Sequence, residues 1–195
     1  MEKTFTLDKT KTALIIIDLQ KGITGREAKP YSSKQVIENA VQLLDAFHKN
    51  EMLVFLVHVG SAPDQKDRLN PVADISWSGS GAPLPADWSQ LVPELLSRNS
   101  DFIITKKQWG AFYGTEIDLE LRRRKIETIV LCGISTNIGV ESTARFAYEY
   151  GYNQIFVEDA MSAQSAEEHE HTVEKIFPRI GLVRKTEEVL LAINS

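Results

Sequence analysis

Residues 12–18 (TALIIID) place four consecutive large aliphatic residues directly before a carboxylate. A run that does not alternate polar with apolar residues is typical of a strand that is covered on both faces of a parallel sheet. Similar short apolar runs occur at residues 52–59, 102–105, 128–133, 154–158 and 180–184. Together they predict a sheet of six strands.

Amphipathic segments separate these runs, and they predict helices near residues 34–50, 115–125, 137–150, 166–177 and 187–193. Ser165 and Glu168 have the spacing of a capping box, which places the start of one of these helices. Strands that alternate with helices are typical of βα units that build a parallel sheet. The predicted fold class is therefore α/β.

The composition is that of an ordinary globular protein, with 195 residues, 43% hydrophobic residues and 25% charged residues. This length predicts a single domain over residues 1–195. A net charge of −5 disfavours a nucleic-acid partner, because such proteins carry a basic excess. No apolar run is long enough for a membrane span and the N-terminal residues do not resemble a secretory signal, so we expect a cytoplasmic protein without a membrane partner.

The stretch at about residues 60–100 breaks the strand and helix rhythm, since it holds five of the seven prolines. It is long for a connection inside a compact domain. We interpret it as a loop-rich excursion that serves as a lid or a subunit interface and contains one short helix near residues 88–97. A solvated loop without a role is the alternative.

Ligands of open parallel sheets collect at the carboxyl ends of the strands, where Asp18, Lys106 and the turn 133–139 (GISTNIG) fall. A carboxylate that closes an aliphatic strand is poorly solvated, which raises its pKa and suits general acid or base catalysis. Lys106 is a candidate for the compensating cation, whereas a simple turn residue is the alternative for Asp18. The glycine-rich motifs of nucleotide sites are absent, so no cofactor is predicted.

Metal ligands do not cluster along the chain. The single cysteine, Cys132, lies inside an apolar strand and is predicted to be a core residue. His58 ends a strand among apolar neighbours, which favours a hydrogen-bonded imidazole. His169 and His171 are two residues apart on a predicted helix and therefore point to different faces. No metal site is predicted.

Three segments resemble the isochorismatase-like hydrolases, also called cysteine hydrolases. They are residues 12–23 (TALIIIDLQKGI), 104–147 (ITKKQWGAFYGTEIDLELRRRKIETIVLCGISTNIGVESTARFA) and 151–163 (GYNQIFVEDAMSA). The resemblance implies a Rossmann-like three-layer sandwich with a six-stranded parallel sheet. It also implies a catalytic Asp, Lys and Cys at the positions of Asp18, Lys106 and Gly139, with Lys107 as a bystander. Homo-oligomers are common in this superfamily, so a homo-oligomer is expected.

Gly139 is the departure from the cysteine hydrolases, because glycine cannot supply the thiolate for covalent catalysis. Cys132 is not a substitute, since it lies seven residues earlier inside the strand. The resemblance offers a precedent, because isochorismatases also carry glycine there and hydrolyse a vinyl ether by acid catalysis. It further implies a cis peptide between Ile134 and Ser135, with the N–H groups of Ser135 and Gly139 turned towards the pocket.

Five residues beside these positions are predicted to bind the substrate: Gln20, Trp109, Phe112, Ser135 and Asn137. Asn137 stands where isochorismatases carry histidine, so the substrate contacts are expected to differ. The leading hypothesis is a hydrolase of a small anionic molecule that uses Asp18 and Lys106 and possesses no cysteine nucleophile. One alternative is a binding protein that kept the pocket without catalysis. Another is an amidohydrolase that directs water onto a carbonyl.

Overall fold

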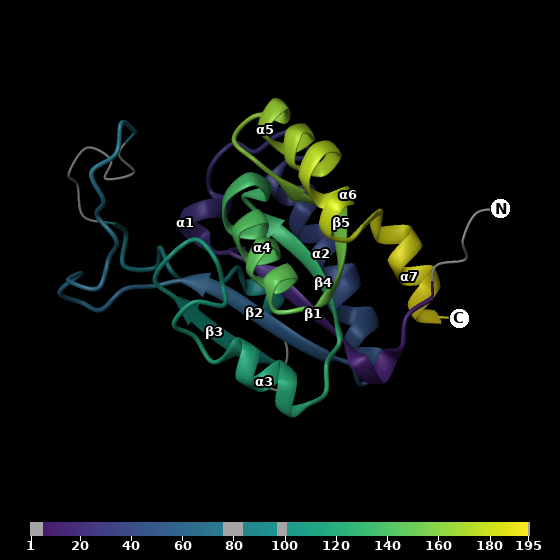
Figure 1. Ribbon diagram of the computed structural model, residues 1–195. Helices are drawn as coiled ribbons and strands as arrows, with labels where there is room; N and C mark the ends of the chain where they lie inside the picture. The colour runs from purple at the N-terminus through teal and green to yellow at the C-terminus, as the bar shows by residue number, and fades with distance from the viewer. Residues whose placement is uncertain (1–5, 76–83, 97–100, 195) are drawn as a thin grey trace.

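The computed structural model describes residues 6–75, 84–96 and 101–194, and its centre is a parallel sheet of six strands (Figure 1). The strand order is β3-β2-β1-β4-β5-β6, with β1 in the middle. This confirms the α/β fold class and all six predicted strands. The strands are β1 (Thr12–Ile17), β2 (Leu53–Val59), β3 (Phe102–Lys106), β4 (Thr128–Ile134), β5 (Asn153–Ser162) and β6 (Leu182–Arg184).

Helices cover both faces of the sheet, which makes three layers (Figure 1). Successive side chains of β1 point to opposite faces, so Leu14 and Ile16 join one apolar core whereas Ile15 and Ile17 join the other. The first core is closed by α2 (Ser33–Lys49) and α7 (Thr186–Asn194). The second core is closed by α3 (Ile117–Arg123), α4 (Glu141–Glu149) and α6 (Phe177–Ile180).

The helix predicted at residues 166–177 is a continuous helical segment of three parts. It begins as α5 (Ala166–His171), passes through the π-helical turn η4 (Thr172–Ile176) and ends in α6. The capping box is present, because Ser165 accepts a hydrogen bond from the Glu168 N–H and the Glu168 side chain accepts one from the Ser165 N–H. The remaining short helices are η1 (Lys9–Lys11), α1 (Lys21–Thr24), η2 (Pro93–Leu95) and the π-helical turn η3 (Thr136–Val140). Within the described ranges, no helix combines the length and apolar character needed to cross a membrane.

A short helix is predicted near residues 88–97, and the described part of that stretch forms only the 3-10 helix η2 within this range. The backbone carbonyls of Trp88 and Gln90 accept hydrogen bonds from Gly22 and Lys21. These carbonyls are therefore committed to another chain segment and do not continue a helix. Residue 97 lies outside the described residues.

Candidate active site

Asp18 follows β1 directly, at the carboxyl end of the central strand. Its backbone takes a left-handed conformation (φ 55°), which aspartate tolerates better than most residues, and its N–H donates to the Val57 carbonyl of β2. The side chain is 5% exposed, and Oδ2 lies 2.7 Å from Lys106 Nζ. Oδ1 is buried and has no hydrogen-bond partner.

Lys106 ends the edge strand β3 and is the buried partner of Asp18, only 1% exposed. Side chains alternate along β3, so Lys106 shares a face with the buried Ile104, whereas Ile103 is 55% exposed. The Lys106 ammonium also donates to the Trp109 carbonyl. The neighbouring Lys107 also lines the cleft, but its ammonium pairs with Asp67 at 2.8 Å rather than with Asp18. The alternation of the strand therefore selects Lys106 rather than Lys107 as the partner of Asp18.

The surroundings of Asp18 favour a carboxyl group that titrates near neutral pH. Burial raises its pKa to about 6, although the ammonium of Lys106 acts in the opposite direction. The Oδ1 atom is the oxygen left for the proton, because Oδ2 accepts from Lys106. The Asp18 carboxyl group can therefore gain and lose a proton at Oδ1 near pH 6, while Oδ2 keeps its contact with Lys106.

Gly139 lies against this pair, within η3. The peptide between Ile134 and Ser135 is cis, as the resemblance predicts. A Cβ atom at Gly139 would lie 2.8 Å from Asp18 Oδ2 and 3.4 Å from Lys106 Nζ. The Gly139 carbonyl accepts a hydrogen bond from the Thr143 hydroxyl at 2.7 Å. Only a residue without a side chain fits between this turn and the carboxylate as they stand.

A cleft of about 540 Å³ opens at these residues, lined by Asp18, Lys106 and Gly139. Trp109 and Ser135, both predicted to bind substrate, also line it. Its described lining carries five cationic side chains against only two carboxylates, in a chain whose net charge is −5. The cations are Arg26, Lys29, Arg68, Lys106 and Lys107, and the carboxylates are Asp18 and Glu27.

The structure does not bring Gln20, Phe112 or Asn137 to the cleft lining. The Gln20 carboxamide is buried, where it accepts from the Val59 N–H and donates to the carbonyls of Val59 and Trp88. Gln20 therefore cross-links the end of β2 to the excursion. Phe112 is buried among aromatic rings, and the side-chain oxygen of Asn137 is buried without a partner.

Several lining residues were not predicted from the sequence, among them Arg26, Arg68 and Trp88. Arg68 and Trp88 belong to the excursion, whose lack of periodicity did not place either residue at the cleft. Gly22 was a usable signal for Trp88, because a Cβ at Gly22 would lie 2.0 Å from the Trp88 ring. A glycine so soon after a sheet carboxylate marks a place where another segment approaches closely.

The environments of His58, His169 and His171 agree with the predictions from the sequence. His58 Nδ1 lies 2.7 Å from the Ser89 carbonyl and Nε2 lies 2.8 Å from the Thr105 hydroxyl. Because a carbonyl can only accept, Nδ1 carries the ring proton and Nε2 accepts from Thr105. His169 is buried and His171 is exposed, as their spacing predicts. No group of three potential metal ligands gathers within the described ranges.

A carboxylate and an ammonium buried together at the carboxyl edge of a parallel sheet, beside a cleft, define an α/β protein with an enzyme-like site. The Isochorismatase domain family matches residues 12–188, and the chain belongs to this family of hydrolases.

Individual relatives agree with this assignment. The uncharacterised isochorismatase family protein YwoC of Bacillus subtilis is 53% identical over 97% of this chain and 98% of its own length. An isochorismatase family protein of Burkholderia thailandensis has a solved structure with a TM-score of 0.92 and 40% identity, covering 97% of this chain and 98% of that chain. The ureidoacrylate amidohydrolase RutB of Acinetobacter baylyi is 27% identical over 92% of this chain and 71% of its own length.

Proposed function

We propose that this chain hydrolyses a small anionic molecule without a covalent nucleophile, with Asp18 as general acid and base and Lys106 as its partner. The observation that carries the proposal is the Asp18 carboxyl group. It is buried at the cleft, tied to Lys106 through Oδ2 and left without a partner at Oδ1, and its pKa is raised to about 6. Such a group can deliver a proton near neutral pH.

A thiolate mechanism is not supported by the only cysteine. Cys132 is fully buried in β4, outside the cleft lining, and burial raises the pKa of its thiol. A thiol in this state is a poor nucleophile, because the thiolate is the reactive form. The reaction is therefore assigned to water rather than to a covalent intermediate on the protein.

The close approach of Gly139 to Asp18 favours an enzyme over a binding protein that merely lost a thiol. A site that still had the shape for cysteine would leave room for at least a Cβ atom. Here that atom would lie 2.8 Å from the Asp18 carboxylate, a distance that requires something to move. The turn and the acid–base pair are thus fitted to glycine.

The excess of cations in the cleft lining supports an anionic substrate. Hydrolysis of an enolpyruvyl ether is the most concrete form of the proposal. Protonated Asp18 gives its proton to the terminal methylene carbon, and the ether carbon becomes an oxocarbenium ion beside the carboxylate. Water adds its oxygen to that carbon and returns a proton to Asp18. The resulting hemiketal breaks its bond to the ether oxygen, which takes up the hydroxyl proton, and pyruvate and an alcohol leave.

The experiment is a thermal-shift screen of small anions and amides, followed by assays for pyruvate and for ammonia. Pyruvate release by the native protein, abolished in Asp18→Asn with the fold retained, is the expected result. Pyruvate release at an unchanged rate in Asp18→Asn would refute the proposal.

A water-using amidohydrolase is the second candidate, favoured by the similarity to RutB, which is named as an amidohydrolase. It would use the same Asp18 and Lys106, so only the product separates the two reactions. Release of ammonia in place of pyruvate would select it. Ligands that stabilise the protein but are never turned over would instead select the non-catalytic binding protein.

A further inference from the structure

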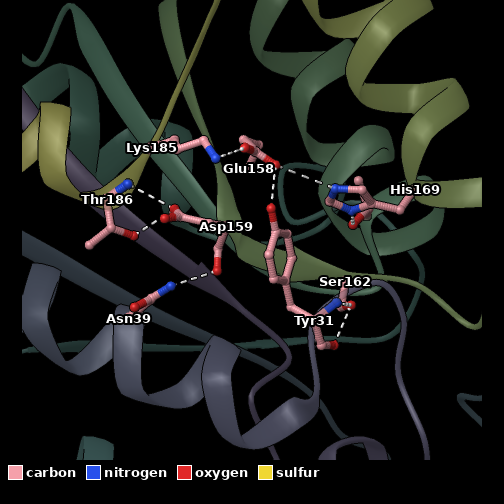
Figure 2. A network of polar contacts seen from close by, with 9 residues as sticks. Tyr31, Asn39, Glu158, Asp159, Ser162, His169, Lys185 and Thr186 are labelled. Atoms are coloured by element: carbon pink, nitrogen blue, oxygen red, sulfur yellow. Dashed lines mark hydrogen bonds and ion pairs between the residues drawn. The ribbon is translucent and has the colours of Figure 1, made fainter. Parts of the chain in front are cut away.

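A second polar cluster, which includes Tyr31, Glu158 and His169, lies outside the cleft lining (Figure 2). At its centre is His169 of α5, which is only 2% exposed. His169 Nδ1 lies 2.8 Å from the hydroxyl of Thr136, a side chain that is itself fully buried. On the other side of the ring, Nε2 lies 3.9 Å from a carboxylate oxygen of Glu158.

Glu158 and Tyr31 complete this cluster on the far side of the imidazole. The Tyr31 hydroxyl donates to Glu158 Oε2 at 3.1 Å, and its ring packs edge-on against His169. Lys185 Nζ lies 3.4 Å from Oε1 of the same carboxylate. Contacts with His169, Tyr31 and Lys185 hold the pKa of Glu158 below its ordinary value, against the effect of burial. The carboxylate therefore stays charged beside the imidazole.

The cluster reaches the cleft through Thr136. This residue is the first of η3, the turn whose Gly139 abuts the Asp18 carboxylate. The preceding residue, Ser135, lines the cleft. A displacement at Thr136 would therefore be passed directly to the residues that exclude water from Asp18.

The cluster also reaches the cleft through the backbone of Tyr31. The Ser162 hydroxyl donates to the Tyr31 carbonyl at 2.6 Å and accepts from the Tyr31 N–H at 3.2 Å. Immediately beside them, Lys29 and Ala163 exchange two backbone hydrogen bonds of 2.9 Å, and both residues line the cleft. One buried imidazole thus connects two parts of the cleft lining that are distant in the sequence.

We propose that His169 is a positioning residue of the candidate active site, which through the Thr136 hydroxyl holds the turn of Gly139 against the Asp18 carboxylate. It does not react itself, because it is buried and lies outside the cleft lining. The positioning claim rests on the geometry alone, and only its kinetic consequence rests on the function proposed above.

Two substitutions at His169 test the contacts of its two ring nitrogens separately. His169→Asn keeps a polar atom near the place of Nδ1 and can still bond Thr136. His169→Gln keeps one near the place of Nε2 and loses Thr136. Thr136→Val removes the hydroxyl with little change of volume, and Thr136→Ser retains it. His171, exposed on the same helix, supplies the matched controls His171→Asn and His171→Gln.

The readout is the titration of the Asp18 carboxyl, followed by NMR on protein with ¹³C-labelled aspartate and assigned with Asp18→Asn. If the turn loosens, water reaches Asp18 and the cost of burying its charge falls. We expect the titration midpoint to drop by at least about half a pH unit in His169→Gln and Thr136→Val. It should stay at the native value in His169→Asn, Thr136→Ser and both His171 controls.

Equal behaviour of His169→Asn and His169→Gln, whether both shift the midpoint or neither does, would overturn the proposal. A substrate found by the screen adds a second readout, because kcat should fall at least about tenfold in His169→Gln with a smaller change in KM. If no substrate is ever turned over, the proposed function fails, but the Asp18 titration still decides the role of His169.

Discussion

Replacing Gly139 with alanine adds a single methyl group where the structure leaves no room for one. The new Cβ would lie 2.8 Å from Asp18 Oδ2, 3.0 Å from Ile17 Cγ2 and 3.4 Å from Lys106 Nζ. The Asp18 carboxylate is held by Lys106, and Ile17 is part of β1, so neither neighbour moves freely. To make room for the methyl group, either the turn η3 moves away from β1 or the side chains of Asp18 and Lys106 move.

The expected loss of stability follows from two opposing effects. Alanine favours helical backbone over glycine by up to about 1 kcal/mol. Overpacking of a tight interior costs about 1–3 kcal/mol. The overpacking should win, because two of the three nearest atoms lie at or below 3.0 Å. We expect Gly139→Ala to lower the free energy of unfolding by about 1–2 kcal/mol, and Tm by about 3 °C for each kcal/mol.

Gly139→Ala should also lower the turnover rate, by up to about 100-fold, because a shift of about 1 Å in a reacting group can have an effect of this size. Thermal unfolding and the assay of the native substrate measure the two effects. Gly110→Ala is the matched control, since its Cβ would make only ordinary contacts of 3.4–3.5 Å. A Gly139→Ala protein with native turnover and an unchanged or higher Tm would refute the reasoning that this site is fitted to glycine.

Other predictions test the remaining parts of the site and the fold. The pKa of Asp18 is raised to about 6, so a rate of hydrolysis that needs the protonated form should be highest below pH 6 and fall about tenfold per pH unit above it. The Asp18→Asn protein should show no turnover at any pH. The side chains of His48 and Asp101 are buried and form a hydrogen bond of 2.5 Å between Nε2 and Oδ1, so Asp101→Ala should lower the free energy of unfolding by about 1–3 kcal/mol in denaturant titrations. A loss within error would show that this hydrogen bond contributes nothing. Cys132→Ser should leave turnover nearly unchanged. If the folded Cys132→Ser protein had no activity, Cys132 would be the nucleophile and the proposed mechanism would be wrong. Exhaustive chelation should leave activity intact, and restoration by zinc after a loss would show that a metal takes part.

Much of the fold could be predicted because it depends on local patterns. Each apolar run became a strand, since a run such as residues 12–17 can be buried only between two helical layers. The positions of Asp18 and Lys106 followed in the same way, because residues that end parallel strands meet at one edge of the sheet. The choice of Lys106 over Lys107 came from the family resemblance, and the alternation of side chains along β3 gives its physical reason.

The helix predicted in the excursion is shorter than expected in the described residues, because the carbonyls of Trp88 and Gln90 accept hydrogen bonds from residues 21 and 22, far away in the chain. Gln20 illustrates the same limit, since this polar residue close to Asp18 joins the excursion to β2 through hydrogen bonds. Nothing in the local sequence distinguishes these structural uses from substrate binding.

The finer design of the site was decided only by the tertiary structure. The sequence shows that Gly139 lacks a nucleophile, but only the packed turn shows that it lies too close to Asp18 for any Cβ. The sequence shows that His169 and His171 lie on different faces of a helix. Only the fold brings His169 to the hydroxyl of Thr136, 33 residues away in the chain. Periodicity determines which face of an element is buried. Contacts between distant elements depend on differences of less than 1 Å in how those faces pack, and the packed chain alone sets those distances.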